Sequence, residues 1–285
     1  MTISNSPSVY FWRPAAWLRV SGPDAFSFLQ GQFTNDLARL KTDGAVCGLW
    51  LNQKGRVLAD SFVLRGAAED QFWAGSYFSP AALIRERLES YLIADDVVVA
   101  DETADWWGAT IMGKDLVART RAEGTGLMFP GRRGIDGAVE WLVQRPIEFA
   151  GVQTLDRVEM ELARIRAAIP AVPADIGPGE LPNEGGLETD AISYTKGCYL
   201  GQEVMARLKA MGQVRRRLRR VAGTGAPPEC PAKLFQGGQP VGELRSVATG
   251  DSGYVGLALL TLLHWRRDAP LSLAPDAEPV INVTD

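Results

Sequence analysis

The chain has 285 residues and a net charge of −4, and it is 46% hydrophobic and 22% charged, which is the balance of a folded globular protein. It holds one histidine, His264, and three widely spaced cysteines, Cys47, Cys198 and Cys230. These counts exclude a zinc site built on several histidines, a CxxC knuckle, a self-contained iron–sulfur cluster and a disulfide framework. An odd number of free thiols is typical of a reducing compartment.

The first part of the chain alternates short β-rich runs with amphipathic helical patterns. Asp24 is placed to cap a helix that carries Phe26, Leu29 and Phe33 on one face. The turn residues 52–55 join two apolar runs into a hairpin. The predicted elements are strands over 16–20, 46–51, 57–64, 72–77 and 97–100, and helices from 25 and over 80–92.

Weaker strand patterns and a longer helix follow from residue 106. We predict strands over 108–112, 127–129 and 139–144, and a helix over 155–168 with Leu155, Val158, Leu162 and Ile165 as its apolar stripe. A Pro- and Gly-rich segment, 170–186, leads to a helix over about 199–211 that Gly212 closes. The last part holds short β runs broken by Gly and Pro, which predict a small antiparallel barrel.

This order of elements predicts an α+β fold in three parts. We expect a first α+β subdomain over residues 1–104, a second over 105–212 and a C-terminal β-barrel over 213–285. The N-terminus is polar, and no run of about 18 apolar residues occurs. We therefore expect a soluble cytoplasmic protein that does not span a membrane.

Charge is distributed unevenly along the chain. An acidic stretch contains no base between Arg87 and Lys114, and a basic stretch contains no acid between Val204 and Pro228. The members of the basic stretch are Arg207, Lys209, Arg215, Arg216, Arg217, Arg219 and Arg220. Two interpretations stay open: a solvated face or cross-strand ion pairs, or an anion site for a carboxylated cofactor or RNA phosphate. Because no aromatic residues are interleaved in the stretch, RNA is the weaker of the anion alternatives.

The densest cluster of reactive residue types is KGCYLGQE, residues 196–203. Cys198 lies where an irregular segment enters the predicted helix, close to Lys196 and to the basic stretch, and this setting favours a functional thiol. Gly197 and Gly201 allow close backbone approach, and Glu203 falls in the first helical turn.

The other two cysteines and the histidine are weaker candidates for a functional role. Cys47 lies in an apolar strand and is expected in the core. Cys230 lies between a glutamate and a proline in a predicted loop, with no partner that the sequence reveals. His264 follows an apolar strand, where a core or edge position is the default and a catalytic base the alternative.

With Arg207 four residues after it, KGCYLGQE resembles the diagnostic motif of the YgfZ family of folate-binding proteins, which are relatives of the glycine-cleavage T-protein, an aminomethyltransferase. The likeness extends over nearly the whole chain. The other segments that carry it are 20–36 with its L-Q-G-Q-F-T-N-D string, the N-Q-K-G-R hairpin at 52–56, Tyr91 to Val97, and Val241 to Ser246.

This resemblance implies folate-binding subdomains and a barrel around a central channel for tetrahydrofolate or a derivative, with a role in assembly or repair of iron–sulfur clusters, including those of a tRNA-modifying enzyme. Cys198 would be the functional thiol and Lys196 would lie beside the folate. Because the chain has no self-contained metal site, Cys198 would ligate a cluster only together with a client or carrier protein. Carried over, the ligand-binding residues are Lys196, Gly197, Tyr199, Gln202, Glu203, Arg207 and Asp60.

Two departures from the T-protein pattern bear on its activity. The T-protein relatives have an Arg-x-Glu-x-Gly-x-Pro stretch whose glutamate holds the pterin ring, and here Arg166 takes the place of that glutamate. A guanidinium cannot accept the donors of the pterin, so another carboxylate must serve or binding must be weak. Of the paired aspartates after the hairpin, only Asp60 is present, preceded by Ala59.

We therefore expect an accessory protein rather than an enzyme, acting through Cys198 in iron–sulfur cluster maintenance. The alternative is a folate-dependent one-carbon transferase that uses Asp60 or Glu203 as its polar catalytic group. A third class, RNA binding through residues 215–220, would show a steep loss of affinity with salt.

Overall fold

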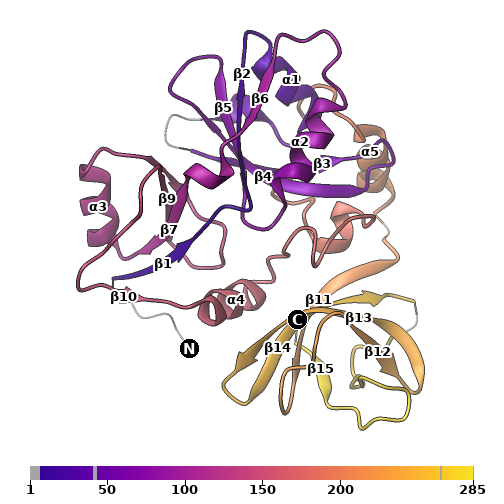
Figure 1. Cartoon of the computed structure of the whole chain (residues 1–285). Helices are drawn as coiled ribbons and strands as arrows, with labels where there is room; N and C mark the ends of the chain where they lie inside the picture. The colour runs from indigo at the N-terminus through magenta and orange to yellow at the C-terminus, as the bar shows by residue number, and fades with distance from the viewer. Residues whose placement is uncertain (1–6, 41–43, 213, 264, 285) are drawn as a thin grey trace.

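The computed structural model describes residues 7–40, 44–212, 214–263 and 265–284. Within these ranges the strands form three five-stranded sheets, and the barrel lies below the two mixed α/β parts in Figure 1. The fold is α+β with a C-terminal antiparallel barrel, as the sequence predicts.

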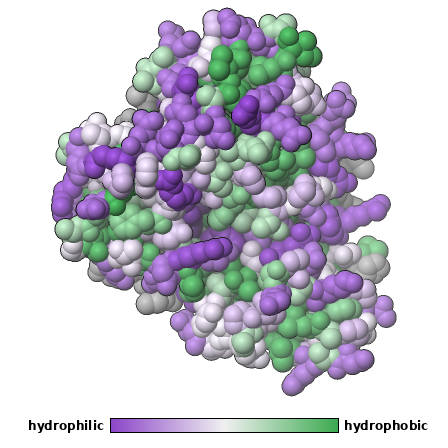
Figure 2. Space-filling view, in the orientation of Figure 1, coloured by the Kyte–Doolittle hydropathy of each residue, from purple (hydrophilic) through white to green (hydrophobic). Residues whose placement is uncertain are grey.

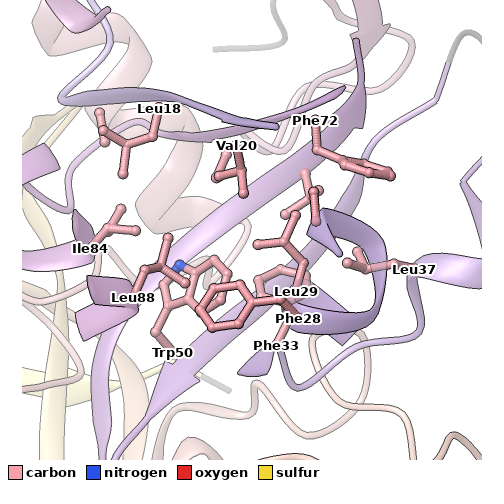
Figure 3. Close-up of a cluster of buried hydrophobic side chains, with 14 of the residues drawn as sticks. Leu18, Val20, Phe28, Leu29, Phe33, Leu37, Trp50, Phe72, Ile84 and Leu88 are labelled. Atoms are coloured by element: carbon pink, nitrogen blue, oxygen red, sulfur yellow. The ribbon is translucent and has the colours of Figure 1, made fainter. Parts of the chain in front are cut away.

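The first sheet has the strand order β3-β4-β5-β2-β6. Its strands are β2 (Ala16–Ser21), β3 (Val46–Leu51), β4 (Val57–Arg65), β5 (Gln71–Ser76) and β6 (Val98–Asp101). Alternate side chains of β2, such as Leu18 and Val20, point to one face, where helices α1 (Ala25–Gln32) and α2 (Ala81–Glu89) cover them. Figure 3 shows Leu29 of α1 and Leu88 of α2 directed into this same cluster around Trp50.

The opposite face of the first sheet packs on the second sheet through aromatic side chains. Trp17 and Trp73 of the first part stack with ring centroids 5.5 Å apart, and Trp106 lies 5.0 Å from Trp73. Since these rings fill the space between the two sheets together with Trp12 and Phe129, burial of aromatic surface holds the two parts together.

The second sheet has the order β10-β1-β7-β9-β8 and carries helix α3 (Lys114–Ala122). Its strands are β1 (Ser8–Trp12), β7 (Trp107–Met112), β8 (Leu127–Pro130), β9 (Val139–Val143) and β10 (Gln153–Thr154). Although β1 lies within the residues 1–104 expected to form the first subdomain, it pairs with β7, so the N-terminal strand belongs to the second sheet.

The third sheet closes into a barrel. Its order is β12-β13-β14-β11-β15, with strands β11 (Arg216–Gly223), β12 (Ala232–Gln236), β13 (Gln239–Gly250), β14 (Gly253–Thr261) and β15 (Ile281–Val283). Leu271 pairs with Ile281 of β15, and the next residue, Ser272, pairs with Phe235 of β12. These two bridges join the edge strands and complete the ring.

Helix α4 (Arg157–Arg166) connects the second sheet to the barrel through a buried carboxylate. Asp175, which is 0% exposed, accepts from Arg164 Nη1 of α4 at 2.6 Å and from the Ala171 amide at 2.8 Å on Oδ2. Its Oδ1 accepts from Ser246 Oγ of β13 at 2.5 Å. One side chain of the Pro-rich segment thus ties together α4, its own loop and the barrel.

The remaining segments complete the chain. Three short 3-10 turns, η1 (Leu37–Arg39), η2 (Thr103–Asp105) and η3 (Pro182–Gly185), lie in the connections. Helix α5 (Gln202–Met211) follows the Pro-rich segment, and Gly212 closes it in the left-handed conformation, as predicted.

Several predicted details are wrong, each for a physical reason. Phe26 is 37% exposed, because Phe28 and Leu29 form the buried face of α1 instead. Val158 is 53% exposed, and α4 turns Met160 and Arg164 inward. Helix α5 begins at residue 202 rather than at about 199, and the barrel strands are longer than expected, with β13 reaching 12 residues.

The Asp175 junction leads to a stability prediction. Asp175→Ala removes the buried partner of Arg164 and of Ser246, and we expect it to lower the free energy of unfolding by about 3 kcal/mol. Asp251→Ala is the matched control, because Asp251 pairs with Arg166 of the same helix while 74% exposed, and exposed pairs contribute below about 1 kcal/mol. Denaturant unfolding followed by tryptophan fluorescence measures both; equal losses would contradict the role of Asp175.

Candidate functional site

Lys196 is buried and joins the KGCYLGQE segment to residues 30–35. Its side chain is 8% exposed, and Nζ donates to the main-chain carbonyls of Gln30, Phe33 and Asn35 at 2.5, 2.7 and 3.1 Å. The carbonyls of Gln30 and Phe33 lie at the C-terminal end of α1, where helical carbonyls lack partners in the helix, and Asn35 lies just beyond this end. Burial lowers the pKa of Lys196 to about 8, while the Asp36 carboxylate favours the charged form.

The same two segments are joined by further hydrogen bonds. Thr34 Oγ1 donates to the Ala191 carbonyl at 2.7 Å, and the Ser193 amide donates to the Thr34 carbonyl at 3.0 Å. Asn35 Nδ2 donates to the carbonyls of Cys47 and Asp190 at 2.7 and 2.8 Å. The L-Q-G-Q-F-T-N-D segment and the segment that leads into KGCYLGQE are therefore one interlocked unit.

The β3–β4 hairpin packs against the other end of the motif. A Cβ at Gly55 would lie 2.9 Å from side-chain atoms of Val204 and Met205, and a Cβ at Gly201 would lie 3.0 Å from the Asn52 carbonyl oxygen. Both glycines have positive φ, +68° and +85°, which other residues rarely adopt. The two glycines let the hairpin and the start of α5 touch, so three sequence motifs meet around residues 196–205.

The motif has a buried half and an exposed half. Tyr199 packs in the core with the Lys196 ammonium 5.2 Å from its ring centroid, and its hydroxyl is buried without a hydrogen-bond partner among the described residues. Gly197, Cys198, Glu203 and Arg207 are exposed, and Gln202 is half-buried at the first position of α5. Cys198 lies in the loop before the helix, so its thiol is presented to solvent by anchors on both sides.

A separate cavity of about 240 Å³ lies between α4, the Pro-rich segment, the second sheet and the barrel. Its polar and charged walls include Tyr77, Arg132, Arg157 and Glu161. A narrow slot of about 20 Å³ shares Tyr77, Phe78 and Arg132 with this cavity and reaches Asp60 and Cys47. The slot is as small as a single water site, so side chains nearly close this end.

Asp60 lies at the inner end of the slot. Its Oδ1 accepts from Ser76 Oγ at 2.7 Å and from Ser79 Oγ at 2.6 Å, while Oδ2 accepts no hydrogen bond from the described residues. Burial raises the pKa of this carboxyl, and the two hydroxyls and Arg132 oppose the rise. Asp60 is therefore an acceptor held in place on one oxygen and open on the other.

The neighbouring groups of the slot are also ordered. Arg132 donates through Nε and Nη2 to Asp190 Oδ2 at 3.0 and 2.7 Å. Cys47 is half-buried and borders the slot rather than lying fully in the core, and burial raises the pKa of its thiol to about 11. Cys230 is exposed in the loop before β12.

The predicted site residues do not form one cluster. Leu187 and Ala191 line the slot, whereas the residues of KGCYLGQE and Arg207 are absent from the walls of both cavities. Arg166 Nη2 donates to Asp251 Oδ2 at 3.1 Å on the barrel side of α4, away from the cavity walls. His264 lies outside the described residues.

Sequence reasoning missed most of the cavity. Tyr77, Phe78, Arg132 and Arg157 come from separate segments, and no motif or spacing marks them. The aromatic and arginine side chains of these segments indicate a binding cavity only after the fold has brought the segments together.

Part of the basic stretch is taken up by ion pairs within the chain. Arg216 Nε lies 2.9 Å from Glu184 Oε1, and Arg217 Nη1 lies 3.2 Å from Glu188 Oε1. These two arginines do not pair across strands with the acidic stretch, because their carboxylate partners come from the η3 region. The described residues contain no group of three or more His, Cys, Asp or Glu side chains placed to hold a metal ion. No helix in the described ranges is both long and apolar enough to cross a membrane.

Two family descriptions match this chain. The GCVT N-terminal domain matches residues 14–118, and the C-terminal beta-barrel domain of CAF17 matches residues 215–281. The solved structure of glycine cleavage system aminomethyltransferase T from Bartonella henselae superposes with a TM-score of 0.79 over 98% of this chain and 85% of that one. At 18% identity, this likeness shows a common fold.

Curated relatives match most of the chain. The mitochondrial iron–sulfur cluster assembly factor IBA57 of Mus musculus is 30% identical over 273 residues, covering 86% of this chain and 75% of the relative. The tRNA-modifying protein YgfZ of Edwardsiella ictaluri is 30% identical over 237 residues, covering 73% of this chain and 67% of the relative. Together with a GcvT-like fold in which the segments around KGCYLGQE interlock, these matches show that the chain belongs to the IBA57/YgfZ family.

Proposed function

We propose that this protein is an accessory factor in iron–sulfur cluster assembly or repair that acts through the Cys198 thiol. The names of its relatives, an iron–sulfur cluster assembly factor and a tRNA-modifying protein, support this role and a tRNA-modifying enzyme as one client. The observation that carries the proposal is the convergence of three motifs on one loop that holds an exposed thiol between a buried lysine and a glycine–glycine contact.

In this proposal Cys198 supplies one ligand of a cluster and a partner protein supplies the others. A single thiolate cannot hold a cluster alone, and iron–sulfur clusters take cysteine ligands from several positions. An exposed loop thiol suits a shared or transient ligand, since a partner can reach it without opening the fold. The cluster is cargo in this scheme, passed on or repaired rather than kept.

Lys196 is a positioning residue here rather than a catalytic one. Its three protons already point to three carbonyls, so the ammonium has no donor left for a ligand. We propose that it sets the place of Cys198, two residues away, by holding the loop against α1.

We further propose that the cavity binds a folate-type ligand. The donor and acceptor set suits a pterin and its carboxylated tail: Asp60 Oδ2 accepts ring donors, Tyr77 and Phe78 pack on flat rings, and exposed Arg157 attracts carboxylates. Asp60 or Glu161 would then replace the acceptor that Arg166 cannot provide. The slot must widen to admit a ring, and Phe78, which is 37% exposed, has room to turn.

The one-carbon transferase is the second candidate, and Asp60 at the inner end of the slot is the observation that favours it. Such an enzyme would form methylene-tetrahydrofolate from an aminomethyl donor and would keep this activity in Cys198→Ser. We rank it second because the paired aspartate is absent and the interlocked motifs surround Cys198 instead. A cytoplasmic location remains a prediction, and the mammalian relatives are mitochondrial.

The role of the thiol is tested by Cys198→Ser in a deletion strain. We expect iron–sulfur enzyme activity to fall to the level of the empty strain while the melting temperature stays unchanged, because the exchange is nearly isosteric at an exposed position. Cys230→Ser, also an exposed thiol, is the control and should rescue fully. Full rescue by Cys198→Ser would overturn the proposal.

The burial of Lys196 leads to a pH prediction. Its folded pKa of about 8 lies below the ordinary 10.5, so between these values the unfolded chain binds a proton at this side chain that the folded chain lacks. The free energy of unfolding should therefore rise with pH in this window, by at most about 1.4 kcal/mol per pH unit. Lys196→Met should lose this slope; identical slopes in urea unfolding of both proteins would show that the lysine titrates normally.

Ligand binding is tested by titrating tetrahydrofolate while following protein fluorescence. We expect Asp60→Asn to weaken binding about tenfold, since a charged acceptor contributes roughly 1.5–3 kcal/mol. Arg166→Ala alters the same region outside the cavity walls and should bind as the wild type does. Equal affinity of wild type and Asp60→Asn would place the ligand elsewhere.

A further inference from the structure

We propose that the outer face of α5, together with the tip of the β3–β4 hairpin, is a docking surface for an acidic protein. Its cations are Lys54 at the hairpin tip and Arg207 and Lys209 on α5, and we call this surface the α5 face. The inference deepens the proposed function, because it gives the chemistry of the partner that approaches Cys198.

The cations of the α5 face come from two elements that are in contact. The hairpin turn contacts Val204 and Met205 through Gly55, so Lys54 adjoins the first half of α5. Arg207 and Lys209 flank the stripe that α5 buries, so they stand at the two sides of the exposed face of this helix. The loop that carries Cys198 enters α5 at Gly201, against the same hairpin.

These cations are not neutralised within the described residues. Lys54 and Arg207 are exposed and have no carboxylate at ion-pair distance among them. Lys209 Nζ lies 4.2 Å from the Tyr194 ring centroid, a contact that leaves its charge in place. The only acid on the outer face of α5 is Glu203.

Cations a few residues farther along the chain behave differently. Arg216 and Arg217 are paired with Glu184 and Glu188, and Arg220 Nη1 donates to the Arg166 carbonyl at 2.7 Å. The basic stretch therefore has two parts. The arginines named on β11 bind groups of the same chain, whereas the cations of α5 face solvent or a partner.

Charge is also separated across the first sheet. In the order β3-β4-β5-β2-β6, β3 and β6 are opposite edges. Asp95, Asp96 and Asp101 are exposed at the β6 edge, whereas the α5 face lies at the β3–β4 end. Figure 2 shows hydrophilic side chains projecting from the edge of the molecule where Figure 1 places α5. In a chain of net charge −4, the loop that carries the exposed thiol thus adjoins a surface that bears positive charge.

An acidic protein fits this surface better than RNA does. Proteins that hold nucleic acid tightly typically neutralise about 6–10 phosphates, and the α5 face offers three cations. Base stacking needs exposed aromatic rings, but Tyr199 is buried and Tyr194 lies under Lys209. Between the cations α5 exposes Ala206 and Ala210, whose small side chains let a protein surface approach closely.

The test measures how fast Cys198 reacts with charged peptides. Three peptides of equal length carry one cysteine activated as a thiopyridyl disulfide, flanked by glutamates, serines or lysines. The Cys198 thiolate attacks the peptide sulfur, a mixed disulfide forms, and pyridine-2-thione leaves in every case, so intrinsic reactivity is matched. Mass mapping assigns the adduct to Cys198 in a Cys230→Ser background, and rates are divided by those of N-acetylcysteine amide.

We expect the glutamate peptide to react about tenfold faster than the lysine peptide at low salt, with the gap closing at high salt. Reversing the charge in Lys54→Glu/Arg207→Glu should invert the preference. Lys114→Glu/Lys233→Glu, which reverses two exposed cations on α3 and on β12 of the barrel, changes the net charge by the same amount and should leave the preference intact.

Two results would overturn the inference: equal rates for the three peptides, or protection of Cys198 by single-stranded RNA at physiological salt without a preference for the glutamate peptide. The assay contains no iron or sulfide. The two proposals are therefore tested separately. Equal peptide rates with the wild-type protein refute the docking surface, whereas rescue of the deletion strain by Cys198→Ser refutes the proposed function.

Discussion

The arrangement around Cys198 depends on one ammonium group placed among main-chain carbonyls. A helix end leaves carbonyls without partners, and Lys196 satisfies those at the end of α1 from more than 160 residues along the chain. Removing the lysine would leave these buried carbonyl oxygens without a donor, and a shorter cationic side chain would not reach them. The position of the loop that holds Cys198 therefore depends on α1, and a buried contact holds an exposed thiol in place.

Local elements were predictable where periodicity and turn chemistry agree. The hairpin of β3 and β4 follows from two apolar, β-rich runs joined by the turn residues at 52–55, and Gly212 marks the end of α5. Strand β1 was not predicted, because its partner β7 lies about a hundred residues away and the pattern of five residues is ambiguous. Helix α3 was missed because it buries only Leu116 and Thr120.

The motif indicates where three segments interlock, but not which of its side chains are buried and which are exposed. Lys196 and Tyr199 also belong to residue types that can take part in chemistry, yet both are buried and serve packing or hydrogen bonding. No spacing in the sequence shows which side chain turns inward, since that depends on α1 and the hairpin. Arg166 is the same case: the resemblance to the T-protein pattern puts it at a ligand position, but α4 directs it to Asp251 on the barrel.

The cavity and the thiol are separate sites joined by one short segment. Leu187 and Ala191 form part of the slot wall, and the chain continues from them to Lys196 and Cys198. The Ala191 carbonyl accepts from Thr34, whose neighbour Asn35 gives one of the carbonyls that hold Lys196. This wall is hydrogen-bonded to the same turn after α1 that anchors the loop of Cys198. Residues 187–198 thus connect the wall of the slot to the loop of Cys198, although the residues of that loop do not line the cavity.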